Sequence, residues 1–194
     1  MDLQKIGVKL YLEGGSHGPL ADYTLVFHRW IQNKSLGGTL LDVVDYRHVH
    51  QGPGVMLVAF EFHLAIDEEN GERGLTIDWK QPLAGAPIER VSQVLATALG
   101  ACATLEREEL PGGRARFAGE RLTIRVGDRA LCPNDPPSRN AFRAELDPLL
   151  ARLYPGLALT VDGEPDPRRR LTAHVRAPEP VSVAELARRL GAPV

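Results

Sequence analysis

The sequence predicts an α+β fold in which an antiparallel sheet carries helices packed on one face. Segments with strand character come in pairs joined by short turns, which is typical of hairpins and therefore of antiparallel pairing. These pairs alternate along the chain with segments whose apolar residues recur at helical spacing, and such elements pack as layers. The 194 residues, with a hydrophobic fraction of 43%, are enough to form a core.

The first half of the chain is expected to contain strands and two helices. The opening strand alternates apolar and polar residues, and the first helix has an apolar stripe of Tyr23, Phe27 and Trp30. Pro87 suits the first turn of the second, alanine-rich helix. The expected elements are strands over residues 4–13, 41–49, 55–66 and 75–80, and helices over 21–33 and 87–109.

The second half repeats this mixture of hairpins and helices. Ser138 is expected to cap a helix, and Pro148 to kink it or to begin a second segment. Ser182 is expected to start the last helix and Gly191 to close it. The expected elements are a short hairpin over 121–126 and 129–132, a helix over 138–154, strands over 157–161 and 170–176, and a helix over 183–190. The similar order suggests two ferredoxin-like halves, residues 1–112 and 113–194, packed as one compact unit.

The chain is organised around residues 40–67, which we expect to form two long strands joined by a turn at residues 51–54. Proline fixes one φ in that turn, and glycine adopts positive φ without a Cβ clash. With a four-residue loop, His50 pairs with Val55, and Asp42 lies opposite His63. This register also places Met56 and Leu64 on the core face, and a one-residue bulge would change it.

Asp42, Glu61 and His63 form the candidate catalytic site. In the expected register Asp42 and His63 have Cβ atoms roughly 5 Å apart, and Glu61 follows on the same face. A carboxylate beside a histidine raises its pKa and makes an acid–base pair, and the same trio offers ligands to Zn²⁺. The alternative is a polar outer sheet face with a cross-strand ion pair, which is ordinary for a half-exposed sheet.

Tyr46, His48 and His50, beside the expected turn, are the candidate ligand-binding residues. His48 lies on the order of 20 Å from the catalytic trio in the expected register, so the three histidines cannot share one metal ion. The metal is therefore unknown, and no cofactor is identified.

Two other features have alternative interpretations. Cys132 is either inert or a reactive thiol, and the arginines at 168–170 form either an anion site or a solvated loop.

Composition excludes several classes of function. The formal net charge of −2 gives no electrostatic case for nucleic acid, and no apolar run approaches the ~20 residues of a membrane span. The first residues lack the apolar core of a signal peptide, and no catalytic signature motif is present. We therefore expect a cytosolic, non-catalytic binding domain that forms a homo-oligomer or binds a protein partner. The alternative is a metal-dependent or acid–base hydrolase built on Asp42, Glu61 and His63.

Overall fold

The computed structural model describes residues 1–14, 18–50 and 52–191. These residues form four α-helices and one eight-stranded antiparallel sheet, so the predicted α+β class is confirmed. No helix among them is long and apolar enough to cross a membrane. The elements are β1 (Ile6–Leu12), α1 (Ala21–Asn33), β2 (Leu40–Asp45), β3 (Val55–Ala59), β4 (Phe62–Asp67), the 3-10 helix η1 (Glu69–Gly71), β5 (Gly74–Trp79), α2 (Pro87–Arg107), β6 (Phe117–Val126), α3 (Pro136–Leu153), β7 (Thr160–Gly163), β8 (Leu171–Arg176) and α4 (Val183–Leu190).

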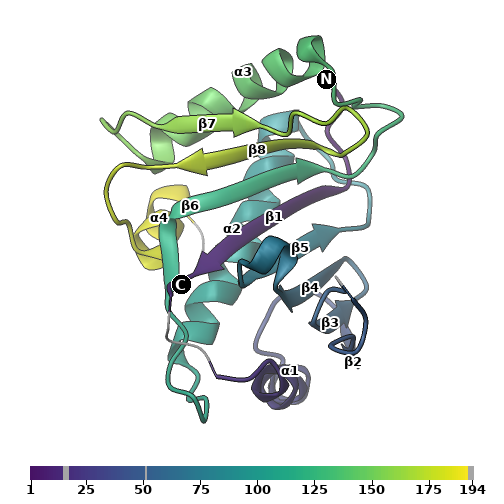
Figure 1. Ribbon diagram of the computed structural model, residues 1–194, viewed down its shortest axis with the longest axis vertical. Helices are drawn as coiled ribbons and strands as arrows, with labels where there is room; N and C mark the ends of the chain where they lie inside the picture. The colour runs from purple at the N-terminus through teal and green to yellow at the C-terminus, as the bar shows by residue number, and fades with distance from the viewer. Residues whose placement is uncertain (15–17, 51, 192–194) are drawn as a thin grey trace.

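The strand order is β2-β3-β4-β5-β1-β6-β8-β7, and every neighbouring pair is antiparallel (Figure 1). The ladder between β1 and β6 joins the two predicted halves, so both contribute to one continuous sheet. In each half the first strand pairs with the last one, β1 with β5 and β6 with β8. The relation of the halves to ferredoxin-like units stays a prediction.

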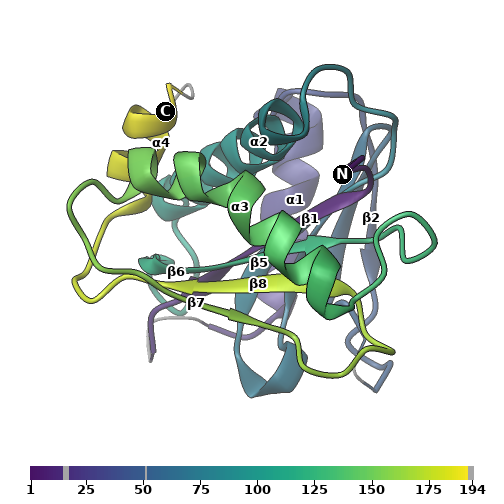
Figure 2. The same cartoon turned by 90° about the horizontal axis from the view of Figure 1, so that it is seen from above.

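The helices pack against one face of the sheet, as predicted, and we call this the covered face. Helix α1 packs on β2 and β3, α2 on β1 and β5, α3 on β8, and α4 on β6. The sheet lies in front of α2 in Figure 1, and Figure 2 shows α2, α3 and α4 on the same side of it. The buried strand residues of the covered face include Val8, Leu10, Val55, Leu57, Leu64, Ile66, Leu75, Ile77, Leu122, Ile124 and Val175.

The opposite face carries no helix except the short turn η1, and we call it the open face. Its side chains alternate with those of the covered face, as the pleat of a sheet requires. Two aligned rows of residues run across it. One row contains Asp42, Val58, His63, Asp78, Gly7, Arg125 and Thr172, and the other contains Val44, Met56, Ala65, Thr76, Lys9, Thr123, His174 and Asp162.

The predicted helix bounds agree with the structure to within two residues, and one predicted cap is wrong. Helix α1 spans the predicted residues 21–33 and buries the predicted aromatic stripe. The cap of α3 is Asp135, whose Oδ1 accepts the backbone N–H of Ser138 at 2.8 Å, so the prediction that Ser138 caps this helix is wrong. The helix continues through Pro148, so Pro148 does not begin a second segment. Gly191 ends α4 in the left-handed conformation, as predicted.

The predicted two-stranded hairpin over residues 40–67 is wrong, because this segment forms three strands. Strand β2 ends at Asp45, so the second half of the predicted strand 41–49 is a loop. A two-residue turn at Phe60 and Glu61 divides the predicted strand 55–66 into β3 and β4. The turn predicted at residues 51–54 includes residue 51, which lies outside the described residues. Gly54 has the positive φ, +68°, that the prediction assigned to such a glycine.

The short hairpin predicted over 121–126 and 129–132 is also wrong. The first segment belongs to the ten-residue strand β6, which pairs with β1 and β8. Residues 129–132 form no strand, because the backbone N–H of Cys132 bonds to the carbonyl of Asp128 in a turn. The Gly127-Asp128 pair therefore ends a strand rather than reversing it.

Candidate functional site on the open face

The predicted pairing of Asp42 with His63 is not formed. Asp42 pairs with Val58 on β3, and Val58 pairs on its other side with His63 on β4. The two side chains share the open face, but they are two strand spacings apart, about 10 Å. The register is wrong because the turn at residues 60–61 inserts a strand between them. The structure therefore does not bring Asp42, Glu61 and His63 together as one cluster.

The two carboxylates of the predicted trio each bind a backbone N–H group. Oδ1 of Asp42 accepts the N–H of Val43 at 2.8 Å, on the edge strand β2. Oε2 of Glu61 accepts the N–H of Thr39 at 2.9 Å, and this bond is the main reason that the pKa of Glu61 is lowered. Both contacts order the polypeptide at the start of β2, so they are structural in the geometry shown.

The carboxylate beside His63 is Asp78, which lies directly opposite it on β5. Burial lowers the pKa of His63, Lys80 lowers it further, and Asp78 raises it. The Nδ1 atom of this imidazole is buried and has no hydrogen-bond partner among the described residues. His63 thus has a carboxylate neighbour, as the sequence analysis expected, but the carboxylate comes from the strand predicted over 75–80, which the analysis did not place beside His63.

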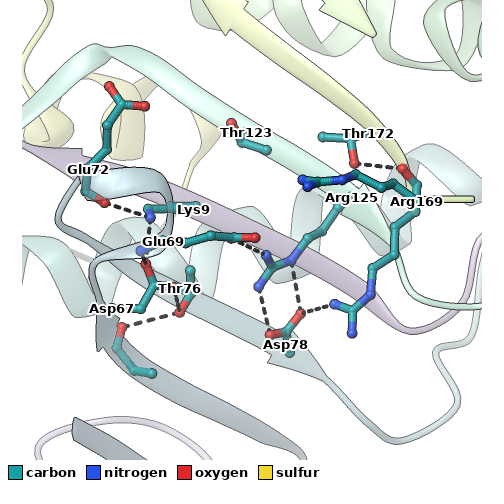
Figure 3. Close-up of polar contacts among 12 residues, drawn as sticks. Lys9, Asp67, Glu69, Glu72, Thr76, Asp78, Thr123, Arg125, Arg169 and Thr172 are labelled. Atoms are coloured by element: carbon teal, nitrogen blue, oxygen red, sulfur yellow. Dashed lines mark hydrogen bonds and ion pairs between the residues drawn. The ribbon is translucent and has the colours of Figure 1, made fainter. Parts of the chain in front are cut away.

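Asp78 is itself held by Arg125, which reaches it across the intervening strand. Nη2 of Arg125 lies 2.9 Å from Oδ2 of Asp78, and Nε lies 3.3 Å from Oδ1 (Figure 3). Between them in the row is Gly7 of β1, where an added Cβ would lie 2.5 Å from Oδ1 of Asp78. The missing side chain of Gly7 leaves the space that this ion pair occupies. Arg125 also bonds Glu69 of η1 at 3.3 Å, and Arg170 lies 3.8 Å from Asp78.

A second ion pair on the open face is buried beneath η1. Nζ of Lys9 lies 2.5 Å from Oδ1 of Asp67 and donates a further hydrogen bond to the carbonyl of Glu72. Thr76 donates to the other oxygen of Asp67, at 3.1 Å. Figure 3 shows this cluster beside the Arg125–Asp78 pair. Lys9 and Asp67 are 4% and 6% exposed, so each charge depends on the other for its compensation.

The candidate ligand residues Tyr46, His48 and His50 lie in the loop between β2 and β3. The N–H of Tyr46 bonds to the carbonyl of Gly54, which closes the base of this loop. His48 and His50 are exposed. Their assignment as a ligand site stays a prediction, although they do not flank a strand-to-strand turn as the sequence analysis expected.

The described residues contain no group of three or more His, Cys, Asp or Glu side chains placed to hold a metal ion. Both cysteines are unpaired and buried, and burial raises the pKa of each thiol. The interpretation of Cys132 as a reactive thiol is therefore not favoured. In the arginine loop, Arg168 pairs with Asp166 and Arg169 with Glu164, so these two cations are partly neutralised within the loop.

The sequence analysis missed the three residues that dominate the open face, which are Lys9, Asp78 and Arg125. A signal was present, because each is a charged residue within an alternating apolar strand. Alternation assigns such a residue to the polar face, but it does not say which strands will be neighbours. As a whole, the cluster pairs each buried cation with a carboxylate, an arrangement that fixes charges in place rather than leaving one ready to accept a proton.

No family model, curated protein or solved structure matches this chain.

Proposed function

We propose that this chain is a non-catalytic binding domain that self-associates through the apolar end of its open face. The apolar end consists of Val44, Met56 and Val58 on β2 and β3, with Leu41 and Phe60 at its margin. The observation that carries the proposal is that these apolar side chains remain partly or largely exposed on a sheet whose other face is packed against helices. Exposed apolar patches mark interaction sites.

A non-catalytic role is supported by the state of the polar groups on the same face. The carboxylates of Asp67 and Asp78 are held by Lys9 and Arg125, and that of Asp42 by a backbone N–H group. A general base needs a carboxylate or imidazole within reach of its substrate proton and not already committed to a cation. The imidazole of His63 is not paired with a cation, but its unpartnered Nδ1 atom is buried, so a substrate proton does not reach it in this geometry. The arrangement therefore favours a surface that recognises a partner over one that performs acid–base chemistry.

A second copy of the chain suits the apolar end better than a strand added at the sheet edge. The outward N–H of Val43 on the edge strand is occupied by the Asp42 carboxylate, and charged groups at an edge oppose strand addition. Face-to-face packing of two sheets leaves this edge intact. The margin of the apolar end carries an acid, Asp42, and a base, Lys80, so a two-fold axis can bring opposite charges together.

The alanine-rich helix α2 is another candidate for an interface, but most of its small residues pack inside the protein. Ala98, Ala101 and Ala103 are buried. We therefore place the proposed interface on the sheet and not on this helix. A cytosolic location is part of the proposal, and it is supported by the two unpaired cysteine thiols.

The test is the molar mass in solution, measured by size-exclusion chromatography with light scattering over a concentration series. We expect a dimer for the wild-type chain and a monomer for Met56→Lys, because the new charge would be desolvated in the interface. Leu131→Lys is the matched control, since Leu131 is 60% exposed and lies in a distant loop, so its dimer should persist.

A wild-type chain that is monomeric at every concentration would overturn self-association. A dimer that survives Met56→Lys with its circular dichroism unchanged would show that the copies meet through another surface.

A further inference from the structure

A cavity of about 190 Å³ lies on the far side of the molecule from the apolar end, between helix α3 and the hairpin of β7 and β8. Its lining residues are Arg139, Asn140, Phe142, Arg143, Val161, Asp162, Gly163, Thr172 and Ala173. The volume is below the usual range of roughly 300–1,000 Å³ for sites that enclose a whole drug-sized ligand. It suits one small polar group.

Two arginines reach this cavity from successive turns of α3. Arg139 and Arg143 are four residues apart, which places both side chains on the same face of the helix. Both are half-buried. Two guanidinium groups on one wall of a small cavity provide several N–H donors and a concentrated positive charge, which is the usual composition of a site for a carboxylate or a phosphate.

Arg139 is held in place by Asn134, which is almost completely buried. Its Nη1 donates to the backbone carbonyl and the side-chain oxygen of Asn134, at 3.3 and 3.2 Å. The amide of Asn134, which is 2% exposed, donates in turn to the carbonyls of Glu164 and Asp166. This network fixes Arg139 without using its Nε and Nη2 donors, which have no hydrogen-bond partner among the described residues.

Arg143 crosses from the helix to the sheet. Its Nε bonds Asp147 at 2.6 Å, and its Nη1 reaches the carbonyl of Val161 at 3.4 Å. The one acidic residue in the lining, Asp162, pairs with His174 in a row whose side chains point to the open face, away from α3. Outside the lining, the positive charge of the two arginines is opposed by two carboxylates, that of Asp147 beside Arg143 and that of Asp135 near Arg139.

Gly163 leaves the space beside Arg139. A Cβ at this position would lie 3.0 Å from Cδ of Arg139, so any side chain would press on the arginine and reduce the cavity. We propose that this cavity binds an oxyanion, the carboxylate or phosphate group of a small ligand, between Arg139 and Arg143. The site is independent of the apolar end, and it stands whether or not the chain self-associates.

The test compares thermal unfolding in sodium phosphate, sodium acetate and sodium chloride at matched ionic strength. Phosphate stabilises folded proteins in general by exclusion from their surface, so the signature of the site is the difference between variants. For a site with a dissociation constant of about 1 mM, 100 mM of the bound anion should raise the midpoint of the wild-type chain by on the order of 5 °C more than that of Arg139→Gln.

Arg152→Gln is the matched control, because Arg152 is on the same helix but outside this cavity, and its response should equal that of the wild type. If the difference in midpoint between the wild type and Arg139→Gln is larger in phosphate than in acetate, the site binds phosphate. If this difference is larger in acetate, the site binds a carboxylate. Equal anion responses in the wild type, Arg139→Gln and Arg152→Gln would overturn the proposal. If Arg139→Gln does not fold, Arg143→Gln gives the same comparison.

Discussion

The covered and open faces of the sheet are built from the same strands but are stabilised in different ways. On the covered face, neighbouring strands contribute aliphatic side chains that helices bury completely. On the open face, the same strands contribute charged residues that compensate one another, as in the Lys9–Asp67 and Arg125–Asp78 pairs. The difference shows that a sheet face on which no α-helix packs can still bury charge, provided that an acid and a base reach each other across one intervening strand. Four changes would test how far this comparison holds.

The largest effect is expected from breaking the buried ion pair of the open face. Lys9→Met leaves the Asp67 carboxylate buried without a cation, which should lower the free energy of unfolding by about 3–5 kcal/mol in urea denaturation. The double variant Lys9→Met/Asp67→Leu should be clearly more stable than the sum of the two single losses implies. Additive losses would show that the two charges do not depend on each other.

A direct comparison of the faces comes from two neighbours on β3. Leu57 is fully buried on the covered face, and Met56 is partly exposed on the open face. Leu57→Ala should cost about 2–5 kcal/mol of unfolding free energy, because it leaves a cavity in the core. Met56→Ala should cost less than about 1 kcal/mol at concentrations where the chain is monomeric. Similar losses of unfolding free energy for both variants would mean that Met56 is packed as tightly on the open face as Leu57 is on the covered face.

A smaller effect is expected where the Arg125–Asp78 pair crosses β1. Gly7→Ala places a Cβ 2.5 Å from Oδ1 of Asp78 and 2.8 Å from the Arg125 side chain, so the pair must shift. We expect a loss of about 1–3 kcal/mol in the free energy of unfolding. Gly37→Ala is the control, since nothing lies within 4 Å of an added Cβ there, and it should be neutral. Equal stability of the two variants would mean that the added Cβ does not disturb the Arg125–Asp78 ion pair.

The smallest effect concerns His63 and pH. Because burial lowers its pKa in the folded state, the unfolded chain binds more protons at this residue as the pH falls through about 6.5. Its contribution to stability is therefore present above that pH and is lost below it, down to the folded-state pKa. In His63→Gln this part of the decline in stability between pH 7 and pH 5 should disappear. A proton NMR titration that gives His63 a pKa above 6.5 would contradict the expectation.

Several features of this protein follow from the sequence alone. The bounds of α1 and its buried stripe of Tyr23, Phe27 and Trp30 are set by helical periodicity, and the Ser182 and Gly191 caps of α4 are set by local hydrogen bonding and backbone conformation. These signals extend over a few residues, so a single chain segment contains all of them. The α+β class is also a consequence of such segments taken in order.

The site was decided by tertiary structure. The two-residue turn at Phe60 and Glu61 lies within a continuous apolar run that reads as one strand, and it reverses the chain there. After that reversal, Val55 and Leu57 rather than Met56 face the core, and Asp78 rather than Asp42 stands beside His63. Arg125 crosses Gly7, which is more than a hundred positions away in the sequence, to reach Asp78, which is 47 positions away. Alternation predicts which residues share a face of one strand. It does not predict which strand lies beside it, because the hydrogen bonds between strands are made by the backbone and do not depend on the side chains. The neighbouring strand is therefore determined by the packing of the whole sheet.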